Sequence, residues 1–112
     1  MEDISMAKTI KIDYKNKTYT LEFNRESIKQ LERGGFKVAE VADYPNLMLP
    51  KLFFGAFKAN HPTVKQKLTD EILDKLENKQ DLLDKLSEMY AEPLETLLDD
   101  SKGNVKWEAT GF

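Results

Sequence analysis

The sequence has 112 residues, a net charge of −3 and a pI near 5.2, and 33% of its residues are charged. That length suits a single domain with its own hydrophobic core. Interleaved acidic and basic residues argue against a nucleic-acid binder, which needs a basic face. With no cysteine, the sequence excludes disulfides, thiolate nucleophiles and cysteine metal sites, and it fits a reducing cytoplasm.

Membrane insertion and secretion are also disfavoured by the sequence. The apolar stretch 46–60 is too short to span a bilayer, and Lys51 interrupts it. The opening residues, MEDISMAK, lack the basic and apolar regions of a signal peptide. We therefore expect a soluble cytoplasmic protein without a membrane partner. Its expected parts are a disordered N-terminus at 1–7, a single domain at 8–103 and a flexible tail at 104–112.

Two runs of alternating apolar and polar residues, 10–14 and 19–23, predict a β-hairpin. Asn16-Lys17 is the expected two-residue turn, because asparagine tolerates the positive φ of a type I′ turn. This register would place Tyr14 opposite Tyr19, Ile12 opposite Leu21 and Ile10 opposite Phe23. An isolated hairpin is marginally stable, so its apolar face should pack on helices. Its two bare edges could pair with another copy or with an extended partner segment.

A short helix should follow the hairpin, with Asn24 as its N-cap. Gly34-Gly35 should end it in a Schellman-type turn, with Phe36 packing back toward Leu31. The segment 36–45 fits either a third strand or a loop with a helical turn. Its last residue, a proline, disfavours a helical conformation at the residue before it.

The stretch 46–60 predicts the central helix of the domain. Its core-facing stripe consists of Leu49, Leu52, Phe53, Ala56 and Phe57. Lys51, Gly55 and Lys58 should form the solvated back, while Leu47 and Phe54 lie beside the lysines and away from the stripe. Either the helix is covered on two sides, or it is buried on one side and leaves Leu47 and Phe54 for a partner. Pro50 is compatible only with the first turn of the helix.

The C-terminal half of the chain predicts two further helices. Thr63 or Thr69 should start the first, whose inward residues are Val64, Leu68, Ile72 and Leu76. The second should run over 81–100, kinked or split at Pro93. Its apolar stripe consists of Leu82, Leu86, Met89, Tyr90 and Leu97, widened by Leu83, Leu94 and Leu98. The predicted fold class is therefore α+β: an N-terminal β-hairpin packed on a bundle of about four α-helices.

The residues give little sign of catalysis or of a bound cofactor. His61 is the only histidine, and we expect it to be a helix C-terminal histidine favoured by the helix dipole rather than a metal ligand. The glycines at 34–35 lack the lysine and hydroxyl residue of a phosphate-binding loop. We therefore expect a non-enzymatic protein with no cofactor and no metal site.

The order of several spaced motifs resembles a known family. These motifs are Glu22-Phe23, Leu31-Glu32, Gly35-Phe36, the lone Pro45, the run 52–57 (LFFGAF), Leu86, Met89-Tyr90 and Asn104 followed by Trp107-Glu108. Across residues 8–109 the chain resembles the small tail assembly chaperones of long-tailed bacteriophages and prophages of Gram-positive bacteria.

The resemblance implies a non-enzymatic role in the cytoplasm of an infected or lysogenic host cell. Such chaperones coat the tape measure protein, keep it soluble and help recruit tail-tube subunits. The expected partners are therefore the tape measure protein and the major tail protein, with a homo-oligomer as a further possibility. Leu47, Phe54 and Trp107 are the candidate partner-binding residues. The alternative is a small phage-encoded regulator or inhibitor that binds a host protein through the same surfaces.

Overall fold

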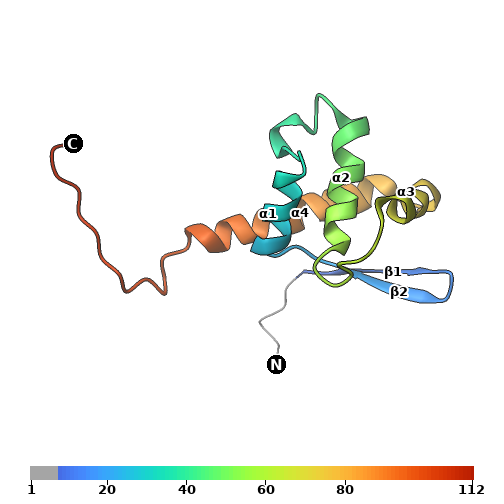
Figure 1. Ribbon diagram of the computed structural model, residues 1–112, viewed down its shortest axis with the longest axis horizontal. Coiled ribbons are helices and arrows are strands. Elements are labelled where there is room, and N and C mark those ends of the chain that lie inside the picture. The colour runs from blue at the N-terminus through green and yellow to red at the C-terminus, as the bar shows by residue number, and fades with distance from the viewer. Residues whose placement is uncertain (1–7) are drawn as a thin grey trace.

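The computed structural model describes residues 8–112 and has the predicted α+β architecture (Figure 1). Within these residues a two-stranded antiparallel sheet precedes one short 3-10 helix and four α-helices. In chain order the elements are β1 (Ile10–Tyr14), β2 (Lys17–Leu21), α1 (Arg25–Arg33), η1 (Val38–Glu40), α2 (Pro45–Phe57), α3 (Gln66–Lys75) and α4 (Lys79–Leu98). The disordered N-terminus expected at 1–7 lies outside the described residues. Residues 104–112 contain no helix or strand and extend away from the body (Figure 1).

The hairpin turns at Lys15-Asn16, so the predicted turn at Asn16-Lys17 and its register are wrong. Both turn residues have positive φ, 51° and 65°, as a type I′ turn requires. The observed partners are Ile10 with Leu21, Ile12 with Tyr19 and Tyr14 with Lys17. A shift of two residues keeps every side chain on its predicted face, because side chains alternate along a strand. The shorter pairing leaves Glu22 free of the ladder, and its amide donates to the Ala56 carbonyl at 2.9 Å.

Helix α1 begins and ends as predicted. The Asn24 side chain accepts from the Ser27 amide at 2.7 Å, and the Ser27 hydroxyl accepts from the Asn24 amide, which forms a capping box. Gly35 has a φ of 102°, and the Phe36 amide donates to the Leu31 carbonyl at 3.2 Å, as in a Schellman motif. Of the two alternatives for the segment 36–45, a third strand or a loop with a helical turn, the structure shows the loop, with one 3-10 turn. The sheet has only two strands within residues 8–112.

Helix α2 lies at the centre of the fold, and its predicted core stripe is largely confirmed. Its buried residues are Met48, Leu52, Phe53, Gly55, Ala56 and Phe57, whereas Leu49 is half-buried. Gly55, predicted on the solvated back, is buried beneath Leu31 of α1. A Cβ at Gly55 would lie 2.8 Å from Leu31 Cδ2, so glycine lets the two helices approach closely. Pro50 lies beyond the first turn, contrary to prediction. It deprives only the exposed Asn46 of a helical hydrogen bond.

The last two helices also differ in detail from prediction. Helix α3 starts at Gln66 after Lys65, with no side-chain cap, so neither predicted threonine starts it. Thr69 is instead fully buried, and its hydroxyl donates to the Gln66 carbonyl at 3.1 Å. Helix α4 continues unbroken through Pro93, so the chain is not split there. It crosses behind α1 and α2 and projects beyond the body at its C-terminal end (Figure 1).

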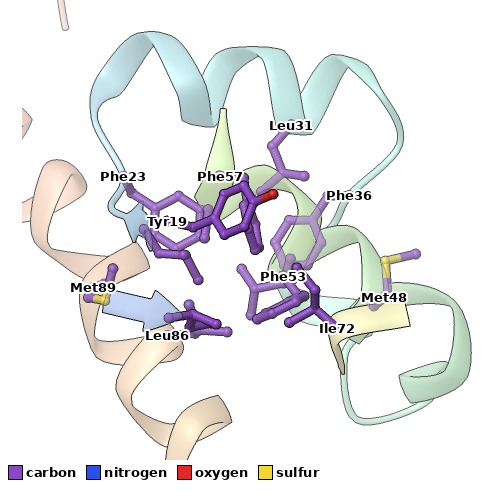
Figure 2. Packing of buried hydrophobic residues seen from close by; sticks show 14 residues of the cluster. Tyr19, Phe23, Leu31, Phe36, Met48, Phe53, Phe57, Ile72, Leu86 and Met89 are labelled. Carbon is purple, nitrogen blue, oxygen red and sulfur yellow. The ribbon is translucent and has the colours of Figure 1, made fainter. Parts of the chain in front are cut away.

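The core gathers aromatic rings from the hairpin, the α1–η1 loop and α2 (Figure 2). Phe57 packs edge-on against Phe53 and Tyr19, with ring centroids 5.1 and 5.5 Å apart. Leu86 and Met89 of α4 close the core from one side, and Ile72 of α3 contributes from another. The inner face of the hairpin is thus buried against helices, which supplies the support that a two-stranded sheet needs.

Candidate binding surface

The apolar stripe of α4 continues beyond the core and lies exposed. Leu86 and Met89 are buried, but Leu94 and Leu97 are each 57% exposed and Leu98 is 74% exposed. The sequence predicted all three leucines as part of a core-facing stripe, and that prediction is wrong for them. The reason is geometric: Leu94 and Leu97 face α1 and η1 across a groove rather than in close packing, and α4 projects beyond the body at its C-terminal end (Figure 1).

The exposed stripe forms one wall of a groove of about 360 Å³ between α1 and α4. Residues Tyr90, Pro93, Leu94 and Leu97 come from α4 at helical spacing, and Ile28 and Val38 supply apolar surface opposite. Arg25 and Lys29 of α1 add positive charge at the rim. An apolar groove with a charged rim is the shape that receives an amphipathic helix.

Tyr90 fixes the inner end of this groove. Its ring packs edge-on against Phe36 and Phe23 at centroid distances of 5.3 and 5.6 Å. Its hydroxyl donates to Glu32 Oε2 at 2.7 Å, which ties α4 to α1. Burial, and secondly the hydrogen bond to the Glu32 carboxylate, raise the pKa of Tyr90 well above its ordinary value. The phenol therefore stays neutral and continues to donate its hydrogen bond to Glu32. This bond holds the Tyr90 side chain in place at the inner end of the groove.

The three residues predicted to bind a partner lie on two separate parts of the molecule. Leu47 is 56% exposed and Phe54 is half-buried, and both lie on the same strip of α2 as Lys51 and Lys58. The Lys58 ammonium lies 5.1 Å from the Phe54 ring centroid. Trp107 is 85% exposed in the extended C-terminal segment, away from α2 (Figure 1). The structure therefore places Leu47 and Phe54 on the same side of α2, whereas Trp107 lies on a different part of the molecule.

The α1–α4 groove was missed at the level of sequence although its signal was present. Leu94 and Leu97 continue the helical period of Leu86 and Tyr90. Periodicity shows that a helix has an apolar face, but it does not show what covers that face. The positions of the neighbouring helices decide this, and those positions follow from tertiary packing.

His61 joins α2 to the outer edge of β2, which corrects its predicted role as a dipole-favoured histidine. Its Nε2 accepts the Thr20 amide at 3.0 Å, and Asn60 donates to the Thr20 carbonyl at 3.1 Å. The ring also lies edge-on to Tyr19 at 5.1 Å. An imidazole nitrogen that accepts must be unprotonated. Burial, and secondly the charge of Lys17, lower the pKa of His61.

This geometry predicts a pH dependence of folding stability. Since the pKa of His61 is lower in the folded than in the unfolded state, its contribution is fully present above the unfolded value of about 6.5. It is lost as the pH falls through the folded value. Replacing His61 with glutamine keeps an acceptor but removes the titration. Thermal unfolding between neutral and mildly acidic pH should therefore show a larger fall in Tm for the wild type than for His61→Gln. Parallel profiles would contradict the assigned bond.

The described residues show no further sign of chemistry. Among residues 8–112, no three histidine, aspartate or glutamate side chains are grouped to hold a metal ion. Within the same residues, no helix is long and apolar enough to cross a membrane. The surface features that stand out are therefore apolar: the α1–α4 groove, the Leu47–Phe54 strip and the C-terminal segment.

Comparison with known proteins identifies a family but no characterised relative. No curated protein and no solved structure matches the chain. A family model described as "Domain of unknown function (DUF5055)" matches residues 6–111, so the chain belongs to this family.

Proposed function

We propose that this protein is a non-enzymatic tail assembly chaperone that binds a helical segment of a phage tape measure protein. It would do so in the cytoplasm of an infected or lysogenic bacterial cell and would assist assembly of the tail tube from the major tail protein. The observation that carries the proposal is the exposed apolar groove between α1 and α4 on a body whose surface is otherwise rich in charge. The motif resemblance described above supplies the identity of the partner.

The dimensions and chemistry of the groove suit this role. Its α4 wall presents Tyr90, Leu94 and Leu97 at positions that an amphipathic helix can contact along about two turns. Arg25 and Lys29 would face acidic side chains on the rim of that helix. A contact along about two helical turns buries a small area, and interfaces of small area are often transient, which suits a chaperone that must leave the finished tail.

The test is co-expression with the tape measure protein encoded near this gene, followed by purification of the complex. Replacing Leu94 and Leu97 together with serine should weaken capture by about tenfold or more, since a central apolar contact contributes about 2 kcal/mol. Stability should change little, because both side chains are 57% exposed. Glu95→Ser, an exposed change between them on the same helix, is the matched control and should capture the tape measure protein normally.

Two outcomes would redirect the proposal. If Leu47→Ser with Phe54→Ser abolishes capture while the Leu94 and Leu97 variant does not, the binding surface is the α2 strip rather than the groove. If the tape measure protein is not captured but one defined host protein is retained through the groove, the protein is a regulator or inhibitor of that host protein.

A further inference from the structure

The two edges of the hairpin are not equivalent. In an antiparallel pair the hydrogen-bonded residues alternate, and the pair that flanks a two-residue turn is bonded. Tyr14–Lys17, Ile12–Tyr19 and Ile10–Leu21 are therefore bonded pairs, so the backbone groups of Thr18 and Thr20 on β2 and of Lys11 and Asp13 on β1 point outward.

The outer edge of β2 is already closed at its Thr20 end. His61 accepts the Thr20 amide, Asn60 donates to the Thr20 carbonyl, and the Glu22 amide donates to Ala56. In contrast, no residue in 8–112 bonds to the outward backbone groups of Lys11 and Asp13. The expectation of two bare edges is therefore wrong for the Thr20 end of β2, whereas β1 can still accept another strand along its length.

The C-terminal segment has the pattern that such a strand needs. Residues 105–109, VKWEA, alternate apolar and charged side chains as β1 does in IKIDY. Val105 and Trp107 are 86% and 85% exposed, and no hydrogen bond joins residues 104–112 to the body as described. A segment with strand periodicity, an exposed tryptophan and no contacts lacks the partner that would bury its apolar face.

Antiparallel pairing of this segment with β1 matches both charge and polarity. With Trp107 opposite Ile12, Glu108 faces Lys11 and Lys106 faces Asp13, so both exposed pairs are of opposite charge. On the inner face, Val105 faces Tyr14 and Ala109 faces Ile10, and both β1 side chains are only half-buried in the single chain. Parallel pairing in the same register would set lysine beside lysine and glutamate beside aspartate.

Pairing of the segment with β1 of its own chain in this register would require the linker residues 99–104 to be almost fully extended. Helix α4 and β1 run in opposite directions, with Ile10 and Met89 lining one groove (Figure 1). The rise from Met89 to Leu98 carries the chain about 14 Å away from Ile10, and Tyr14 lies about 13 Å in the other direction. Residues 99–104 span at most about 25 Å to Val105 when fully extended, and a turn between Asp100 and Gly103 shortens that span.

We propose that residues 105–109 of one copy add as a third strand to the β1 edge of a second copy. Reciprocal exchange between two chains closes a two-fold dimer in which Trp107 covers Ile12 and Tyr14 of the partner. This interface shares no residue with the α1–α4 groove, so its test is independent of the tape measure protein.

Charge exchange in the full-length protein tests the proposal. The edge variant carries Lys11→Glu with Asp13→Lys, and the tail variant carries Lys106→Glu with Glu108→Lys. Each variant alone sets like charges opposite one another at every pair, so its dimer dissociation constant should rise about tenfold or more. An equimolar mixture of the two restores opposite charges at both interfaces and should form a heterodimer as tightly as the wild type. Sedimentation velocity measures all three, and circular dichroism verifies folding.

The control is Asp100→Lys with Lys102→Glu, which exchanges charges outside the paired segment and should dimerise as the wild type does. Three results would overturn the proposal. One is a wild type that stays monomeric at every concentration. Another is wild-type dimerisation by both the edge and tail variants. The third is a chain with all four substitutions that dimerises as the wild type does, while the mixture of the edge and tail variants does not. That result would place the segment on β1 of its own chain.

Discussion

Replacing Phe57 with alanine is expected to lower the free energy of unfolding by about 3–5 kcal/mol. The side chain is fully buried, and its ring packs edge-on against both Phe53 and Tyr19, so truncation leaves a cavity bordered by α2 and the hairpin. A domain of this size has only about 5–15 kcal/mol of stability in total. The variant should therefore unfold at a much lower urea concentration than the wild type, or accumulate poorly in soluble form.

Phe54→Ala is the matched control on the same helix. Its ring is half-buried beside Lys58 in the pocket between α1 and α2, so its loss should cost only about 1 kcal/mol. Equal shifts of the urea midpoint for the two variants would contradict this assignment. They would show that α1 and α2 bury Phe54 as completely as the core buries Phe57.

The second large effect is expected for Leu21→Lys. Leu21 has no exposed surface and lies opposite Ile10 on the inner face of the hairpin. A lysine there must bury an ammonium group without a partner, and we expect a loss of about 4 kcal/mol or more. Thermal unfolding followed by circular dichroism should show a strongly lowered Tm or no cooperative transition.

Thr18→Lys gives the comparison on the outer face of the same strand. Thr18 is exposed and lies opposite Asp13, so a lysine there meets an opposite charge in solvent. Its Tm should stay close to that of the wild type. A larger loss for Thr18→Lys than for Leu21→Lys would mean that the hairpin packs on the helices through its other face.

The sequence predicted the faces of the hairpin correctly and its register wrongly, for one physical reason. Alternation determines which side chains are buried, but it leaves shifts of two residues equivalent. Alternation alone does not choose between turns at Lys15-Asn16 and Asn16-Lys17, and in the observed register the Glu22 amide bonds to Ala56, far along the chain. No local pattern contains that contact. The capping box at Asn24 and the turn at Gly35 were predictable because both are local.

The burial of individual helix positions was less accessible from sequence. Gly55 was predicted to face solvent because it lies at helical spacing from Lys51 and Lys58, yet its lack of a side chain is what admits Leu31. Leu94 and Leu97 were predicted as core because apolar periodicity is the same for a core and an interface. Of the residues predicted to bind a partner, Leu47 and Trp107 are exposed and Phe54 is half-buried, and their binding remains a prediction.

The hydrogen bonds at the Thr20 end of β2 tie the hairpin to α2 and to the residues that follow it. To separate the hairpin from α2, the backbone amides of Thr20 and Glu22 and the carbonyl of Thr20 must all lose their partners together with the buried face of Tyr19. Each such bond contributes about 0.5–1.5 kcal/mol net, because the separated groups would be hydrated. The hairpin and α2 therefore form one cooperative unfolding unit, although about forty residues of chain separate Thr20 from His61. The exposed apolar side chains Leu94, Leu97 and Trp107 lie outside this unit, at the far end of α4 and in the segment beyond it.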